Sequence, residues 1–368
     1  MKSDAKKVLF VANNFDIAIY RFRKEVIQAF LKKNIEVSIC TPFSNTAVEF
    51  CKYYNIKFYS LHIDRRGKNI FKDLILLFRY LIIIKKAKSD YIFSYTIKPN
   101  LYIGILNIFF KKKYYPNVTG LGSVFTENNL FTKAIIKLYQ ISFSSSEKVF
   151  FQNEANKNIF LDEKIIKANK AVLLPGSGVN LLEKLFCEYP KDDGMVRLLF
   201  LGRIMKDKGI FELIEAFDYL TKEYDNIYLE ICGFVEEDKS KLRNLIKSNE
   251  KIQYSGFIND VVGKIKHCHV MVLPSYHEGL SNVLLEASSM GRPSIASDIP
   301  GCKEIVDDDI SGMLCVSKDV ESLIKSLKAF IDLSYSDKIT MGKKSRDKVE
   351  QTFDRNIIID KYLQEVFK

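Results

Sequence analysis

The sequence lacks the cysteine patterns of disulfide-linked and zinc-binding proteins. Its seven cysteines are scattered over 368 residues, and no two of them form a CxxC pair. This distribution excludes a disulfide scaffold and a zinc module, and it is typical of a reduced, cytosolic chain. A cleavable apolar segment is also missing at the start, because the polar residues 1–7 lead directly into the strand-like run 8–12. We therefore do not expect export.

Apolar runs long enough to cross a membrane are missing too. The run 74–84 is interrupted by Arg79 and falls far short of the roughly 20 residues that a spanning helix needs. A second run, 101–110, ends in the lysines 111–113. Lysine-flanked apolar helices can lie in a membrane interface with their cations on lipid phosphates, although helices buried against a sheet would give the same runs. We predict a cytoplasmic protein attached peripherally to the inner face of the cell membrane.

Acidic residues are scarce in the first half of the chain. Residues 1–180 contain 29 Lys and Arg but 13 Asp and Glu, a net charge of +16, whereas the remaining residues carry −5. Such asymmetry indicates that the two halves meet different partners. A basic half can face nucleic acid, an anionic membrane or an anionic substrate, and a general enrichment in lysine would give the same excess.

What the sequence does contain is an alternation of short apolar strand patterns with longer helical periods. This alternation is typical of parallel sheets with helices on both faces. A polar, turn-rich zone at 176–194 interrupts the pattern, which then restarts. The sequence predicts two doubly wound, Rossmann-like α/β domains, 1–180 and 181–350, that face each other across a cleft, and a final helix at 351–368 that packs back on the first. The predicted strands are 7–12, 35–40, 56–60, 90–95, 114–118, 148–152, 171–174, 196–201, 227–232, 252–254, 269–273 and 293–297, and the predicted helices include 20–33, 69–88, 130–145, 154–167, 209–223, 236–248, 281–290 and 319–333.

Two carboxylates surround a predicted helix start in the second domain. A buried strand ends at Pro274, a polar loop follows, and Ser281 is a good N-cap for a helix whose first amides would attract an anion. Glu278 lies in the loop, and Glu286 lies about one turn inside the helix, roughly 6 Å along its axis. Because carboxylates repel phosphate, their natural partners are hydroxyl groups that flank it. A solvated loop and helix face would also account for the pair.

Two cations near the end of the strand 196–201 supply a counter-charge. Gly202 permits close backbone approach, Arg203 offers a planar fork to phosphate oxygens, and Lys208 adds a point charge. A charged loop without a ligand is the alternative. The glutamates at the end of another strand favour a site for an anion flanked by hydroxyls, as in a nucleotide sugar.

Two apparent metal motifs are interpreted as structural. The acidic run 307–309 formally matches a DxD metal motif, but it precedes a turn and a short strand, and we interpret it as a solvated turn. His267 and His269 have no second ligand pair near them in sequence.

Three sets of residues carry a resemblance when taken together: Gly202-Arg203 with Lys208-Gly209, Gly256-Phe257 with Asp260-Val261, and Pro274-Ser275 with Glu278-Gly279 and Glu286-Ala287. Through them the chain resembles one large enzyme family, glycosyltransferase family 4, whose members have the GT-B fold and retain the anomeric configuration of the transferred sugar. The first half, through 20–23, 98–100 and 119–122, more narrowly resembles bacterial enzymes that extend lipid-linked glycans, including N-acetylgalactosaminyltransferases of polyprenyl-diphosphate pathways.

The resemblance implies a role for each matching residue. Arg203 and Lys208 would bind the donor diphosphate and stabilise the leaving group, and Glu278 would contact the transferred sugar; these three are the predicted catalytic residues. Glu286 would hold the ribose hydroxyls. The backbone at 280–282 would complete the phosphate cradle, and 256–258 would lie against the base. The predicted substrate-binding residues are Glu286, Gly202, Phe257, Ile258, His277, Gly279, Leu280, Ser281, Asn282, Thr119 and Asn13.

The first domain departs from the family pattern in two places. Many relatives have a Gly-Gly loop where this chain has 13–16, and many carry a histidine near the reacting carbon where it has 117–120. Asn13 and Thr119 are the predicted contacts there, with Thr119 facing the acceptor.

The sequence thus predicts a retaining glycosyltransferase that moves a hexose or N-acetylhexosamine from a UDP-sugar to an undecaprenyl-diphosphate-linked glycan. No metal or other cofactor is expected, because cationic side chains and the helix terminus supply the charge that Mg²⁺ supplies elsewhere. A sugar-nucleotide 2-epimerase of the same fold is the alternative. A basic nucleic-acid-binding protein is disfavoured, because the sequence has no helix-turn-helix, RNP or zinc pattern.

Overall fold

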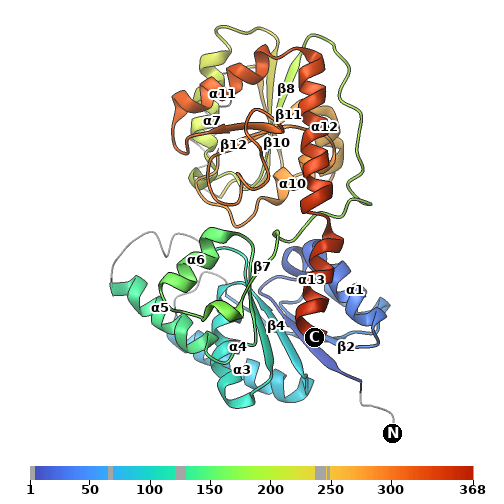
Figure 1. The fold of residues 1–368 in the computed structure, drawn as a ribbon, viewed down its shortest axis with the longest axis vertical. Coiled ribbons are helices and arrows are strands. Elements are labelled where there is room, and N and C mark those ends of the chain that lie inside the picture. The colour runs from blue at the N-terminus through green and yellow to red at the C-terminus, as the bar shows by residue number, and fades with distance from the viewer. Residues whose placement is uncertain (1–4, 65–68, 122–129, 237–245, 247–248, 368) are drawn as a thin grey trace. The chain divides into compact units, whose positions relative to one another are not determined.

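A computed structural model describes residues 5–64, 69–121, 130–236, 246 and 249–367. The chain divides into two compact units (Figure 1), of which the first comprises Met1–Ser177 with Asn356–Lys368 and the second Gly178–Arg355. Each unit is built on one parallel β-sheet with helices on both faces. The predicted fold class, α/β with two doubly wound domains, is therefore confirmed.

The first unit is a seven-stranded sheet in the order β3-β2-β1-β4-β5-β6-β7. All five residues of its central strand, β4 (Tyr91–Tyr95), are buried, as expected for a parallel strand covered on both faces. The chain order reverses between β1 and β4, which is where such sheets bind ligands. The strands are β1 (Lys7–Val11), β2 (Glu36–Thr41), β3 (Lys57–Ser60), β4 (Tyr91–Tyr95), β5 (Lys113–Val118), β6 (Val149–Phe151) and β7 (Ala171–Leu173).

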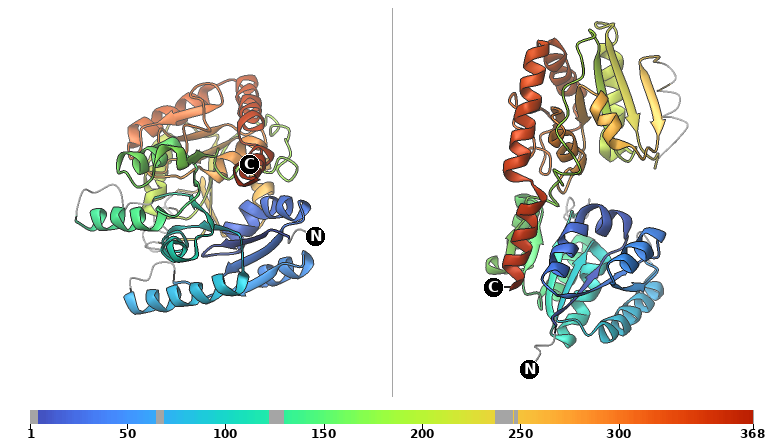
Figure 2. Two further views of the ribbon diagram at one scale, coloured as in Figure 1. Left: turned by 60° about the horizontal axis from the view of Figure 1, so that its bottom comes forward. Right: turned by 90° about the vertical axis from the view of Figure 1, so that its right-hand side faces the viewer.

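Helices cover both faces of this sheet (Figure 2). One face packs on α1 and on the last helix of the chain, α13, whereas the other packs on α3 and α4. In α13, Ile358, Tyr362 and Val366 are buried, and the Tyr362 hydroxyl donates a hydrogen bond to the side chain of Asn117 in β5. The helices of this unit include η1 (Asp16–Arg21), α1 (Phe22–Lys32), α2 (Asn45–Tyr53), α3 (Ile70–Ala87), α4 (Ile97–Phe110), α5 (Leu130–Phe143), α6 (Glu154–Asp162) and α13 (Arg355–Phe367).

The two apolar runs of the first half form α3 and α4, and the helices differ in exposure. Helix α4 buries half of its residues, which agrees with the alternative interpretation of this run as a helix packed against the sheet. Helix α3 buries one side but exposes four apolar side chains spaced by one helical turn, namely Phe71, Leu74, Ile75 and Phe78. We call these four residues the α3 stripe. Among the helices that the structure describes, none is long and apolar enough to cross a membrane.

The second unit is a six-stranded sheet in the order β10-β9-β8-β11-β12-β13. The chain reverses its direction across this sheet between β8 and β11. Its strands are β8 (Val196–Leu201), β9 (Ile227–Cys232), β10 (Ile252–Gly256), β11 (Val270–Leu273), β12 (Ser294–Ser297) and β13 (Gly312–Cys315). Its helices include η4 (Lys206–Lys208), α7 (Ile210–Leu220), α9 (Val261–His267), α10 (Asn282–Ser289), α11 (Val320–Asp332) and α12 (Tyr335–Thr352). Most of the predicted helix 236–248 lies outside the described residues.

A completely buried arginine ties three segments of this unit together. The guanidinium of Arg292 donates hydrogen bonds of 2.8–3.1 Å to five backbone carbonyls and packs over the ring of Tyr189. A guanidinium has five N–H donors, so every donor has an acceptor. The acceptors belong to the segment before β8 (Cys187, Glu188), to α9 (Ile265, Lys266) and to the end of α10 (Met290).

The two neighbouring histidines, His267 and His269, have different surroundings in the structure. Nδ1 of His269 accepts a hydrogen bond of 2.9 Å from the backbone N–H of Arg197, and burial lowers the pKa of His269 to about 4. His269 is therefore a neutral, structural residue, as interpreted from the sequence, whereas His267 is exposed. Within the described ranges, no group of three or more His, Cys, Asp or Glu side chains could hold a metal ion.

Candidate active site

Most of the predicted site residues of the second unit follow the carboxyl ends of β8 and β11. These strands are neighbours in the sheet, with Val270 opposite Leu198. The loop after β8 leads through Arg203 into η4, and the loop after β11 contains residues 274–281. Because parallel strands end at one edge of the sheet, the two loops meet.

Lys208 and Glu278 form an ion pair at this edge. Lys208 Nζ lies 2.5 Å from Glu278 Oε1, and the Ser275 hydroxyl donates to the same oxygen at 2.9 Å. The Lys208 and Glu278 side chains are only 16% and 13% exposed, so solvent screens the pair weakly. An ammonium group has three N–H donors, so Lys208 can bind Glu278 and a phosphate oxygen together. The structure thus brings together two of the three predicted catalytic residues.

Two glycines allow the backbone to close around this pair. Gly209 has φ +68°, and a Cβ there would lie 2.0 Å from the carbonyl oxygen of Pro274. Gly301 has φ +92°, and its Cβ would lie 2.8 Å from Glu278. The Gly301 carbonyl also accepts a hydrogen bond of 2.9 Å from the Ser281 N–H. Gly301 was not predicted from the sequence, although the dipeptide Pro300-Gly301 is a turn signal.

The N-terminus of α10 opens beside the same loop. Ser281 is the N-cap residue, as predicted, but its side chain forms no capping hydrogen bond. The first amides of α10 therefore have no side-chain acceptor at their N-cap and can bind an anion. Glu286 is 6% exposed, so the alternative of a solvated helix face is wrong. Leu280 is also buried, whereas Gly279 and Asn282 are half-buried and His277 is exposed.

Arg203 forms an ion pair with Glu236. It is 52% exposed, and its Nη1 lies 3.2 Å from Glu236 Oε2. Gly202, before it, is half-buried. A planar guanidinium that is half in solvent can turn toward a ligand. In the structure the partner of Arg203 is Glu236, a residue that was not predicted from the sequence.

An aromatic pair stands at the ends of β9 and β10. Phe257 and Phe234 are 59% and 57% exposed, and their rings stack at 4.3 Å with an interplanar angle of 16°. Ile258 is half-buried beside them and packs on the core. Phe257 and Ile258 were predicted from their sequence motif, but Phe234 was not. A single phenylalanine after a strand does not indicate a binding site. The role of Phe234 becomes visible only when the sheet brings it against Phe257.

Two predicted contacts belong to the first unit. Asn13 follows β1 and Thr119 follows β5, and both are half-buried. Because β1, β4 and β5 are parallel, both residues lie at the carboxyl edge of the first sheet, with β4 between their strands.

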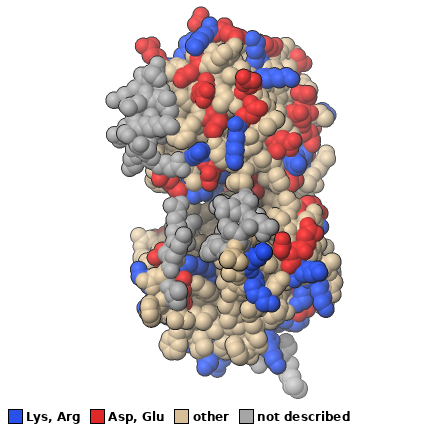
Figure 3. Space-filling model, turned by 90° about the vertical axis from the view of Figure 1, so that its left-hand side faces the viewer, with Lys and Arg blue, Asp and Glu red and all other residues tan. Residues whose placement is uncertain are grey.

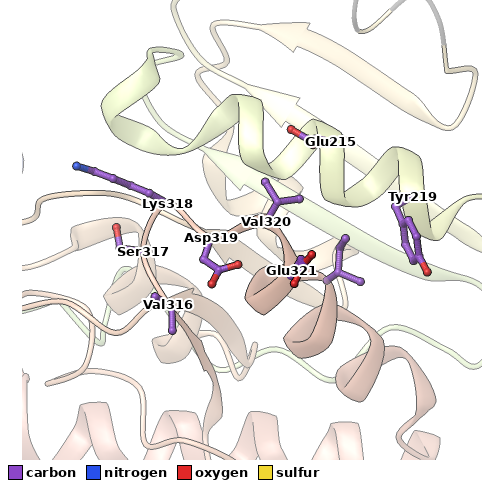
Figure 4. A pocket seen from close by; sticks show the side chains of 9 residues that line it. Glu215, Tyr219, Val316, Ser317, Lys318, Asp319, Val320 and Glu321 are labelled. Carbon is purple, nitrogen blue, oxygen red and sulfur yellow. The ribbon is translucent and has the colours of Figure 1, made fainter.

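One described cavity, of about 740 Å³, lies elsewhere in the second unit (Figure 4). None of the predicted site residues lines it. The residues around it belong to α7, to the segment between β13 and α11, and to the start of α11; they are Glu215, Tyr219, Val316, Ser317, Lys318, Asp319, Val320, Glu321 and Ile324. On the face of the second unit that Figure 3 shows, acidic side chains are widely spread among basic ones.

The two sheets and the pair at the β8/β11 edge define a GT-B glycosyltransferase, and the comparisons agree. Residues 7–153 match the family model "Glycosyl transferase 4-like", and residues 182–348 match "Glycosyl transferases group 1". The chain belongs to the glycosyltransferases that combine these two domains. The predicted family is confirmed, and so is the prediction of an enzyme.

Curated relatives carry related names. The chain is 26% identical to the N,N'-diacetylbacillosaminyl-diphospho-undecaprenol alpha-1,3-N-acetylgalactosaminyltransferase of Campylobacter jejuni, over 94% of this chain and 95% of that protein. It is also 26% identical to the Escherichia coli UDP-Gal:alpha-D-GlcNAc-diphosphoundecaprenol alpha-1,3-galactosyltransferase, over 80% of each chain.

Solved structures share the fold at low sequence identity. A Rickettsia africae glycosyltransferase superposes with a TM-score of 0.81 at 19% identity, over 98% of both chains. The Anabaena protein HepE in complex with UDP and glucose superposes with a TM-score of 0.79 at 14% identity, over 98% of this chain and 99% of that one.

Proposed function

We propose that the protein transfers a hexose or N-acetylhexosamine from a UDP-sugar to an undecaprenyl-diphosphate-linked glycan, in the synthesis of a cell-surface polysaccharide or glycoprotein glycan. The observation that carries this proposal is the Lys208–Glu278 pair beside the N-terminus of α10. It combines a cation and free amides for a diphosphate with a carboxylate for sugar hydroxyls. Relatives named for undecaprenyl-diphosphate-linked substrates support the acceptor.

The donor fits these residues in the following way. The diphosphate lies at the first amides of α10 and against Lys208, and Arg203 turns from Glu236 to the same phosphates. Glu286 accepts hydrogen bonds from the ribose hydroxyls, and the Phe234–Phe257 stack contacts the base. HepE, a protein of the same fold, was solved with UDP and glucose, which supports a UDP-linked donor.

Transfer with retention of configuration then needs little further protein chemistry. The acceptor hydroxyl oxygen forms a bond to the anomeric carbon as the bond from that carbon to the phosphate oxygen breaks. The acceptor proton passes to the leaving phosphate oxygen, and Lys208 and the α10 amides stabilise the charge of the diphosphate. Because these groups supply positive charge at the leaving group, we propose that transfer needs no metal. Thr119 is the proposed acceptor contact of the first unit, and Asn13 is a proposed contact of either the donor or the acceptor.

Donor binding is tested with a thermal-shift panel of UDP-, GDP- and ADP-sugars. A UDP-sugar at 100 times its dissociation constant is expected to stabilise the protein by about 2.7 kcal/mol. Glu286→Ala is expected to lose that shift, and the exposed Glu215→Ala serves as the control. Transfer to a synthetic undecaprenyl-diphosphate-linked sugar is followed in parallel. A chain that shifts with no nucleotide sugar would contradict the proposal, and donor consumption without an acceptor would support the 2-epimerase alternative.

We also propose that the α3 stripe attaches the protein peripherally to the cytoplasmic face of an anionic membrane, where the lipid-linked acceptor resides. Its four apolar side chains are 54–78% exposed, and the exposed cations Lys72, Lys85 and Lys86 lie on the same helix. Exposed apolar side chains flanked by lysines gain free energy from both parts of a lipid interface.

Membrane attachment is tested by sedimentation with vesicles of phosphatidylglycerol and phosphatidylethanolamine. Phe71→Glu/Phe78→Glu is expected to lower the bound fraction at least tenfold, because it removes two exposed aromatic groups that the lipid interface would bury and adds two charges of the same sign as the anionic lipids. The matched control is Phe43→Glu/Tyr53→Glu, which changes two exposed aromatics elsewhere in the unit. Equal binding of both double variants would contradict the role of the stripe.

A further inference from the structure

The loop that carries Glu278 is fastened to the start of α7 at a second point, through Tyr276. Tyr276 is 7% exposed, and its hydroxyl donates a hydrogen bond to the carboxylate of Glu212 in the first turn of α7. Its backbone N–H donates to the carbonyl oxygen of Asp207 at 2.9 Å. A hydrogen bond to an ionised carboxylate is stronger than one between neutral groups, so the phenol is held firmly at its far end.

The segment before α11 also contacts this ring. Lys318 Nζ lies 4.9 Å from the centroid of the Tyr276 ring, a cation–π distance. The neighbouring Ser317 hydroxyl donates to the carbonyl oxygen of Ser275 at 3.4 Å. Lys318 itself has φ +66°, a conformation that non-glycine residues rarely adopt without support. In Figure 4 the Lys318 side chain extends away from the carboxylates of Asp319 and Glu321. Its ammonium group lies over the ring of Tyr276 instead.

We propose that Tyr276 is a positioning residue for Glu278, held by Glu212 and Lys318. The pairs Lys208–Glu278 and Glu212–Tyr276 join the same two elements, the η4–α7 start and the loop after β11. One contact between two elements acts as a hinge, whereas two contacts side by side fix an angle. The Glu278 carboxylate therefore keeps its direction when a ligand draws Lys208 toward a phosphate. This inference rests on the proposed function, because it assigns Glu278 to the transferred sugar.

The test compares Tyr276→Phe with the wild type. The variant keeps the ring beneath Lys318 and removes only the hydroxyl that reaches Glu212. We expect kcat to fall about tenfold or more, because a small misplacement of a reacting group costs up to about a hundredfold. The donor KM is expected to stay within about twofold, because the ribose and base contacts lie on other elements. Amide hydrogen exchange of residues 275–279 is expected to rise. The control Tyr219→Phe, on the exposed side of α7, should change none of these values.

A double-mutant cycle separates positioning from general stability. Glu212→Ala is expected to lower kcat as much as Tyr276→Phe does, and the double variant is expected to be no slower than either one. Glu212→Gln keeps an acceptor and should recover part of the loss. Additive effects, a change in KM alone, or unchanged exchange in Tyr276→Phe would overturn the inference.

Two further results keep this proposal distinct from the proposed function. If the wild type transfers no sugar from any nucleotide donor, the proposed function fails, and hydrogen exchange still shows whether Tyr276 holds the loop. If Tyr276→Phe does not fold, the exposed residue Lys318 is replaced by alanine instead. Lys318→Ala must then raise the hydrogen exchange of 275–279 and lower kcat by less than the tenfold expected for Tyr276→Phe. If a folded Lys318→Ala variant showed the wild-type kcat and the wild-type hydrogen exchange of 275–279, the inference would be overturned.

Discussion

Replacing Lys208 with alanine is expected to lower kcat for sugar transfer by about 10²–10³-fold, the loss seen when one group that stabilises a developing anion is removed. Lys208 has two tasks in the proposed reaction. It stabilises the diphosphate that leaves, and it holds Glu278 at 2.5 Å. The alanine variant removes both and leaves a carboxylate that is 13% exposed without its cation, so diphosphate binding suffers from repulsion as well. Steady-state transfer with a UDP-sugar and the lipid-linked acceptor measures the loss.

The control for this experiment is Lys206→Ala. Lys206 is an exposed residue of the same helical turn, η4, so its replacement makes the same change in net charge. We expect transfer by that variant to stay within about twofold of the wild type, and its melting temperature should match that of the wild type. Equal losses of activity in the two variants would show that net charge, and not the Lys208–Glu278 geometry, decides the rate.

The strands could be predicted from the sequence because parallel strands are buried on both faces. All seven strands of the first sheet and the first five of the second coincide with predicted apolar runs to within about two residues. Helices α2, α9 and α12 were not predicted. Helix α12 is largely polar and α9 is only seven residues long, so the apolar period that reveals a helix is weak in both. Their caps, Asp260 and Ser334, do accept backbone N–H bonds, and such signals are common in loops as well.

The Lys208–Glu278 pair could be predicted only in part. Both residues follow strand ends, and a doubly wound sheet places such ends at one edge. Their direct contact could not be predicted, because it depends on which strands are neighbours. Residues that only shape the site gave no signal of that role. Gly301 is needed because it lies close to Glu278, and Glu212 because it lies close to Tyr276. The pairing of Arg203 with Glu236 was likewise hidden, because these residues come from different strand ends.

Replacing Arg292 with methionine is expected to lower the free energy of unfolding of the second unit by about 3–5 kcal/mol. The side chain is 0% exposed and satisfies five carbonyl oxygens from three segments. Methionine fills similar space but donates no hydrogen bond. Each buried acceptor left without a donor costs about 1 kcal/mol or more, against a total stability of about 5–15 kcal/mol. Because the chain has two units, unfolding is not expected to be two-state, and the transition of the second unit is the one to follow.

For a unit of this size, such a loss lowers the melting temperature by about 10 °C. The matched control is Arg197→Met, in which an arginine 34% exposed and paired with Asp193 is lost; surface ion pairs contribute about 0–1 kcal/mol. Arg292→Lys keeps the charge but offers three donors from one point, too few for five carbonyls on three segments. We therefore expect it to melt between the wild type and Arg292→Met. If the lysine variant were as stable as the wild type, charge alone would hold the segments and the fork geometry would be irrelevant. If both variants matched Arg197→Met, other donors would have to reach the carbonyls, and the segment around Cys187 and Glu188 would need a different anchor to α9.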